Sequence, residues 1–148
     1  MTSTVLVLNG PNLNLLGRRE PGIYGTLSLV DIDALCIEKG KELGLDVTCR
    51  QSNHEGELVT WIQEVYGRFA GVVINPGAYS HTSIALHDAL RSLEEPIIEV
   101  HLSNIHQRES FRHHSYVSLV AKGVICGFGA KGYEMALLGL SSMIEEAS

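Results

Sequence analysis

Glu99 and His101 are two residues apart in the apolar segment PIIEVHL, which has the composition of a buried strand. Side chains two apart on a strand point to the same face, so the carboxylate would lie beside the imidazole. A neighbouring carboxylate orients the ring and favours its protonated form. The pair therefore predicts that His101 is a general acid oriented by Glu99, although a chance pair at a partly exposed strand end would have the same spacing.

A second candidate group lies in the segment NGPNLNLLGRREPGIYG, residues 9–25. A loop of this length inside a compact domain is usually functional. It carries Tyr24 together with Arg19, and Arg18 is the alternative partner. A phenol with a pKa near 10 is a poor base, but a guanidinium favours phenolate and lowers that pKa. Tyr24 could then abstract a proton alpha to a carbonyl, or it could be a loop aromatic that only caps the core.

One segment of this acidic chain, whose net charge is -6, is rich in histidine and arginine. The segment HLSNIHQRESFRHHS, residues 101–115, holds four of the seven histidines together with Arg108 and Arg112. Arginine binds carboxylates through two parallel hydrogen bonds, so a pocket for a small carboxylate is expected here. A nucleic-acid binder would need a broad basic surface, which the charge argues against.

His81 and Asp88 are seven residues apart in a segment with helical character, residues 80–93. That spacing predicts that they share one helix face, with His81 in the first turn beside the preceding loop, NPGAYSHTS. His81 is either a pocket residue or a satisfied helix-cap histidine. Asp88 is either an ordinary exposed charge or the partner of a pocket arginine.

The elements that would position these residues alternate between two kinds. Apolar, β-branched runs predict strands at residues 4–9, 46–51, 71–75, 96–102 and 119–126. Helical spacing predicts helices at residues 27–43, 57–69, 80–93 and 132–146. Ser28 and Asp31 resemble a capping box at the first helix, and Gly44 follows its end. This order predicts one α/β domain over residues 1–148, with helices on both faces of a parallel sheet and a site at the carboxyl ends of the strands.

Other features favour no cofactor. The sequence GFGAKG at 127–132 matches a dinucleotide motif, but the required following strand is missing, so it predicts a tight turn. The histidines lack metal-ligand spacing, so no metal is expected. No apolar stretch approaches a membrane span, and no signal peptide is evident. The three cysteines contain no CxxC pair, which fits a reduced, cytoplasmic protein.

Three blocks of this sequence resemble the type II 3-dehydroquinate dehydratases, in the order and at the spacing of that family. They are LNGPNLNLLGRREPGIYG, NPGAYSHTSIALHDAL and IIEVHLSNIHQRESFRHHS, and with GFGAKGYEMAL the resemblance covers about residues 5–140. It implies a flavodoxin-like three-layer sandwich with strand order 2-1-3-4-5, and a homododecamer built as a tetramer of trimers. It also implies anti dehydration of 3-dehydroquinate to 3-dehydroshikimate through an enolate, without metal, Schiff base or nucleotide. The pathway would be aromatic biosynthesis or quinate breakdown.

The resemblance also implies roles for individual residues. Tyr24 would take the C2 proton, and Arg19 would keep it a phenolate. His101, oriented by Glu99, would protonate the departing C1 hydroxyl, and Asn12 would hold a water against the enolate oxygen. The residues implied to bind substrate, partly through backbone amides, are Asn75, His81, Leu102, Ser103 and Arg112. Asp88 would reach the site of a neighbouring subunit, and Arg108 is a reserve candidate.

Three other readings remain open at the level of sequence. The first is a flavodoxin-like flavin or nucleotide module, although the first loop has no phosphate-binding signature. The second is a metal-dependent hydrolase that uses the histidine-rich segment. The third is a structural oligomer in which the cations serve subunit contacts.

Overall fold

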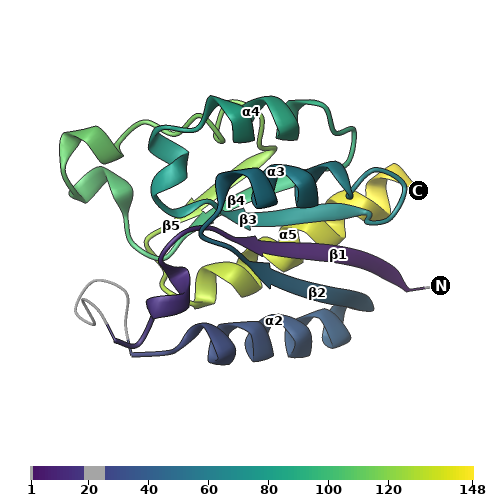
Figure 1. Ribbon diagram of the computed structural model, residues 1–148. Coiled ribbons are helices and arrows are strands. Elements are labelled where there is room, and N and C mark those ends of the chain that lie inside the picture. Colours follow the sequence, from purple (N-terminus) through teal and green to yellow (C-terminus); the bar gives the residue numbers. More distant parts are fainter. Residues whose placement is uncertain (1, 19–25) are drawn as a thin grey trace.

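A computed structural model describes residues 2–18 and 26–148 and shows a parallel sheet of five strands in the order β2-β1-β3-β4-β5 (Figure 1). The strands are β1 Ser3–Asn9, β2 Leu45–Gln51, β3 Gly71–Asn75, β4 Ile97–His101 and β5 Gly123–Cys126. The α-helices of the described residues are α2 Leu29–Leu43, α3 Glu55–Gln63, α4 Ile84–Arg91 and α5 Lys131–Ala147. The predicted flavodoxin-like strand order is confirmed.

Alternation along the strands divides the core into two layers. On β1, Val5 and Val7 pack into the core beneath α2 and α5, whereas Leu6 and Leu8 pack into the core beneath α3 and α4. Figure 1 shows the two pairs of helices on opposite faces of the sheet. All four β1 side chains are fully buried, as expected for a central strand of a parallel sheet.

The helix predicted over residues 27–43 has the expected capping residues at both ends but begins two residues later, at Leu29. Ser28 is the N-cap, and its hydroxyl accepts a hydrogen bond from the backbone N–H of Asp31, whose carboxylate accepts in return from the Ser28 backbone. Gly44 ends the helix in the left-handed conformation, with φ of 73°. The capping box predicted from the sequence is therefore confirmed.

The predicted helix over residues 80–93 is wrong at its start. A 3-10 helix, Gly77–His81, precedes α4, and Ser83 caps α4 by accepting from the Leu86 N–H at 2.9 Å. His81 and Asp88 therefore lie on different elements, and their spacing of seven does not place them on one helix face. The cause is local, since serine is one of the preferred N-cap residues and the Ser83 hydroxyl caps the backbone N–H groups at the start of α4.

The two largest remaining differences from the predicted boundaries are at the end of α3 and the start of β5. Helix α3 ends at Gln63 instead of residue 69, because the chain passes into a turn that contains Gly67 with φ of 75°. Strand β5 begins at Gly123 instead of residue 119. The GFGAKG segment is the predicted tight turn, with positive φ angles at Gly127 and Gly129.

The loops that follow β1 and β3 lie against each other at the carboxyl edge of the sheet. A Cβ atom on Gly10 would lie 2.4 Å from the carbonyl oxygen of Pro76, so only glycine permits this approach. The Gly10 N–H donates to the backbone oxygen of Asn75 at 2.8 Å. This contact brings Asn12, which follows β1, close to Asn75 at the end of β3.

Candidate active site

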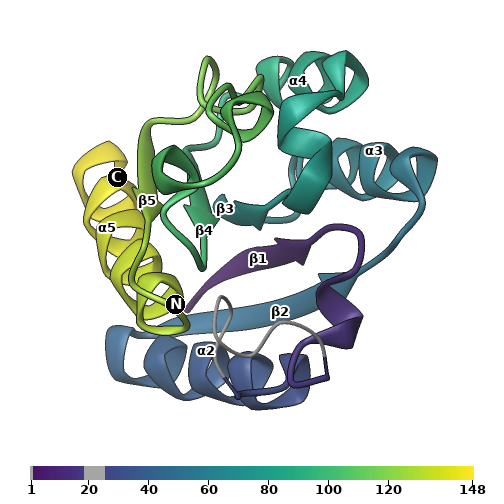
Figure 2. The same cartoon turned by 90° about the vertical axis from the view of Figure 1, so that its left-hand side faces the viewer.

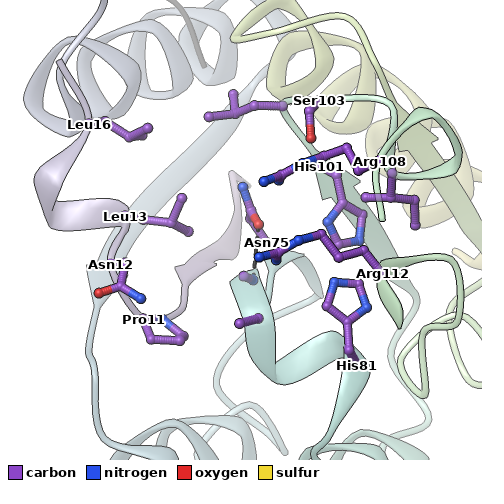
Figure 3. Close-up of a pocket in the computed structure, with 14 residues that line it drawn as sticks. Pro11, Asn12, Leu13, Leu16, Asn75, His81, His101, Ser103, Arg108 and Arg112 are labelled. Carbon is purple, nitrogen blue, oxygen red and sulfur yellow. Dashed lines mark hydrogen bonds between the residues drawn. The ribbon is translucent and has the colours of Figure 1, made fainter. Parts of the chain in front are cut away.

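The strands β1, β3 and β4 end at one edge of the sheet (Figure 2). The segments that follow these three ends supply the residues that line a pocket. Asn12 and the neighbouring leucines form one wall, and the histidines and arginines form the other (Figure 3). The structure brings together seven residues predicted from the sequence: Asn12, Asn75, His81, His101, Leu102, Ser103 and Arg112.

His101 and Glu99 form the predicted pair on β4. The His101 Nε2 atom lies 2.5 Å from Glu99 Oε2, and because a carboxylate only accepts, Nε2 carries the proton of this bond. The other ring nitrogen, Nδ1, is then the atom that can exchange a proton with a bound molecule. Glu99 is fully buried and His101 is 5% exposed, so the pair lies at the inner end of the pocket.

The Glu99 carboxylate stays ionised in spite of its burial. Burial by itself raises the pKa of a carboxyl group, but the hydrogen bond and charge of His101 oppose it, as do hydrogen bonds from Ser118 and Ser115. The pKa of Glu99 is therefore lower than its ordinary value. The ionised carboxylate accepts the hydrogen bond from His101 Nε2 and thereby fixes the orientation of the ring.

His81 is favoured in its neutral form. Burial, the largest cause, lowers its pKa, and the positive charges of His101 and Arg112 act in the same direction. Its Nδ1 atom lies 2.8 Å from the carbonyl oxygen of His114, so Nδ1 donates and Nε2 is left as an acceptor in the neutral ring. A neutral imidazole of this tautomer can accept a hydrogen bond from a substrate hydroxyl.

Two arginines line the pocket from the segment after β4. Arg112 Nε lies 3.1 Å from Glu109 Oε2, and Arg108 Nε lies 3.8 Å from Glu109 Oε1. Their side chains are 25% and 16% exposed respectively. Arg108, held in reserve from the sequence, is therefore as much a part of the pocket wall as Arg112. Two guanidinium groups at one wall suit a carboxylate ligand.

Asn75 is held from behind by a residue that sequence reasoning missed. Its Nδ2 atom donates to the Tyr133 hydroxyl at 2.9 Å, and that hydroxyl donates to Asn9 Oδ1 at 2.6 Å. Burial raises the pKa of Tyr133, which keeps it a phenol. The Asn75 Oδ1 atom accepts from the Gly77 N–H at 3.2 Å. No local pattern signals Tyr133, which lies 124 residues from Asn9 in the chain.

Asn12 adopts a left-handed backbone conformation, with φ of 68°, which asparagine tolerates better than most residues. Its backbone N–H donates to Asn53 Oδ1 at 2.9 Å. The 3-10 helix Leu13–Leu15 follows, and Leu13 and Leu16 give the pocket an apolar wall that sequence reasoning also missed. Their spacing of three within NLNLLG is the signal that could have found them.

Four predicted residues remain besides those seven, and one of them, Glu99, lies behind His101 as described above. Tyr24 and Arg19 lie outside the described residues. Asp88 is exposed on α4 and contributes nothing to the pocket of its own chain.

Within residues 2–18 and 26–148, no three histidine, cysteine, aspartate or glutamate side chains gather in a group that could hold a metal ion. No helix in the same ranges is long and apolar enough to cross a membrane.

The pocket thus combines an imidazole–carboxylate pair with two guanidinium groups, which suits acid–base chemistry on a small carboxylate. Comparison with known proteins agrees. The family described as Dehydroquinase class II matches residues 3–141. A 3-dehydroquinate dehydratase of Brucella canis is 63% identical over 146 residues, which cover 99% of this chain and 93% of that protein.

Solved structures agree as well. The type II dehydroquinase from Propionibacterium acnes superposes with a TM-score of 0.92 at 54% identity, covering 96% of this chain and 98% of that one. The type II dehydroquinase from Butyrivibrio crossotus DSM 2876 has the same TM-score at 47% identity, covering 94% and 97%. The chain therefore belongs to the class II dehydroquinase family. Its activity is that of the type II 3-dehydroquinate dehydratases, which are hydro-lyases.

Proposed function

We propose that this chain removes water from 3-dehydroquinate by anti elimination through an enolate, with Tyr24 as the base and His101 as the acid. The observation that carries the proposal is the His101–Glu99 pair at the inner end of a pocket lined by two arginines. The C2 proton of the substrate is alpha to a ketone, so its removal leaves a delocalised enolate. Collapse of the enolate then breaks the C1–O bond.

His101 supplies the proton that this second step needs. The departing hydroxide is a poor leaving group unless it is protonated as the bond breaks. With Nε2 bound to Glu99, the imidazolium would deliver its proton from Nδ1 and become neutral. Water is released, and the proton taken by Tyr24 returns through solvent to restore the acid.

The rest of the pocket would bind and orient the substrate. Arg112, with Arg108 beside it, would hold the carboxylate, and the neutral His81 would accept from a hydroxyl through Nε2. Asn75 has a second amide hydrogen for another hydroxyl, and the backbone of Leu102 and Ser103 would complete the contacts. Binding at several points fixes the C1–O bond in the orientation that anti elimination requires.

The remaining roles are proposed from the family resemblance. Arg19 would keep Tyr24 as a phenolate, and Asn12 would place a water against the enolate oxygen. Asp88 is exposed, as a residue that reaches the site of a neighbouring subunit must be before assembly. We accordingly propose a homododecamer of four trimers, a single catalytic domain over residues 1–148, a cytoplasmic location, and a role in aromatic biosynthesis or quinate breakdown.

The test is an ultraviolet assay for the conjugated product, in which His101→Ala is compared with His106→Ala. His106 is exposed on the same segment and does not line the pocket, so its loss should leave turnover near wild type. His101→Ala should slow turnover by about 10²–10⁴-fold, the range for a positioned acid. Equal turnover in the two variants would contradict the assignment of the acid. Borohydride added with substrate should leave the enzyme active, because no imine is formed.

A further inference from the structure

Glu99 has two hydrogen-bond donors besides His101, and both come from the segment between the arginines and β5. Ser115 Oγ donates to Glu99 Oε2 at 2.7 Å, and Ser118 Oγ donates to Glu99 Oε1. Neither serine lines the pocket. They lie 16 and 19 residues from Glu99 in the chain, and nothing in the proposed reaction uses them.

The three donors together fix the carboxylate. Oε1 is held by Ser118, and Oε2 is shared by Ser115 and His101, so the carboxylate has a partner on each oxygen and cannot rotate without losing one. Glu99 itself is fully buried, and Ser118 is partly buried. Hydrogen bonds to a charged group are stronger than those between neutral groups.

We propose that Ser118 and Ser115 are positioning residues of the dehydration reaction, which act by holding the Glu99 carboxylate against the ring of His101. The inference rests on the proposed role of His101 as the acid. The proton donor His101 then belongs to a network of four residues with Glu99, Ser115 and Ser118, and neither serine lines the pocket. Loss of either hydroxyl should therefore impair proton delivery without touching the substrate.

Ser118 is the cleaner residue to test. Ser115 Oγ also accepts from the N–H groups of Val117 and Ser118, at 3.2 and 3.4 Å, so it closes a turn as well as binding Glu99. Among the described residues, the Ser118 hydroxyl bonds to Glu99 alone. Ser92→Ala is a matched control, because the Ser92 hydroxyl also donates, but to the Ala89 carbonyl on the exposed end of α4.

The expected result has a defined sign. Removal of one donor from the ionised carboxylate raises the pKa of Glu99, which is now held below its ordinary value. In a plot of kcat against pH, the acidic limb is the range in which the Glu99–His101 pair takes up a further proton. This limb therefore moves to higher pH. The shift should be about 1–2 pH units, from about 1.5–3 kcal/mol per charged hydrogen bond. The titratable and charged groups that face the pair from this edge, His81, Arg108 and Arg112, are left in place by the substitution.

The experiment measures kcat and KM against pH for Ser118→Ala, for Ser92→Ala and for the wild type. We expect kcat at neutral pH to fall about 5–30-fold in Ser118→Ala with KM within about two-fold, because no substrate contact is lost. Ser92→Ala should match the wild type. Ser118→Cys keeps a weak donor and should give a smaller shift in the same direction, which also serves if the alanine variant fails to fold.

A double-mutant cycle with Glu99→Gln shows whether Ser118 acts through Glu99. In the Glu99→Gln background, Ser118→Ala should change kcat by less than about two-fold. Additive losses, or an acidic limb that does not move in Ser118→Ala, would overturn the inference. Full turnover in His101→Ala would instead contradict the proposed function. The two proposals are therefore tested by different variants.

Discussion

Tyr133→Phe removes one hydroxyl from the network that supports Asn75. The side chain is fully buried, and its hydroxyl accepts from Asn75 Nδ2 and donates to Asn9 Oδ1. Asn9 Nδ2 already lacks a hydrogen-bond partner among the described residues, so the substitution leaves Asn9 with both amide atoms unsatisfied. The newly unpaired groups are Asn9 Oδ1 and Asn75 Nδ2. At about 1–3 kcal/mol for each such buried group, the free energy of unfolding should fall by roughly 2–6 kcal/mol.

Urea unfolding at fixed protein concentration measures this loss, with Tyr66→Phe as the control because Tyr66 is 75% exposed. Activity gives a second readout, since a less restrained Asn75 should raise KM more than it lowers kcat. A loss of stability below about 0.5 kcal/mol, which is ordinary for a surface change, would refute the view that this hydroxyl holds the network together.

Three further predictions follow from the site and its support. Arg112→Ala should raise KM about 10–100-fold with a smaller change in kcat. The control is Arg68→Ala, which should change neither, because the Arg68 side chain is 63% exposed. A loss confined to kcat in Arg112→Ala would contradict a binding role. Gly10→Ala should lower the melting temperature, because its Cβ would lie 2.4 Å from the Pro76 oxygen, and an unchanged melting temperature would show that the loops separate freely. The lowered pKa of Glu99 contributes stability that is present above the unfolded pKa and is lost as pH falls through the lower folded value. Glu99→Gln removes this group, so the free energy of unfolding should fall less in the variant than in the wild type on acidification below about pH 4.5.

The sheet and the central pair of the site could be predicted because both depend on short spacings. The alternation of Val5 and Val7 with Leu6 and Leu8 makes β1 a buried strand, and the spacing of two places Glu99 beside His101. Strand order beyond the parallel arrangement came from the family resemblance, since composition does not specify it.

Contacts between distant parts of the chain could not be predicted in this way. Tyr133 reaches Asn75 from α5, and Ser118 reaches Glu99 from the segment before β5, so no local period connects them. The placement of His81 and Asp88 failed because one cap, Ser83, moved the start of α4 past His81. Arg108 was visible as a cation of the right segment, but only the folded segment shows that it faces the pocket.

The most direct test of the proposed division of labour between Tyr24 and His101 is hydrogen exchange at C2 of 3-dehydroquinate, followed by nuclear magnetic resonance in D₂O. If Tyr24 forms the enolate and His101 acts only on the leaving hydroxyl, His101→Ala should exchange the C2 proton while eliminating water about 10²–10⁴-fold more slowly. Tyr24→Phe should do neither, although it still binds substrate. Exchange at the wild-type rate by Tyr24→Phe would contradict the account.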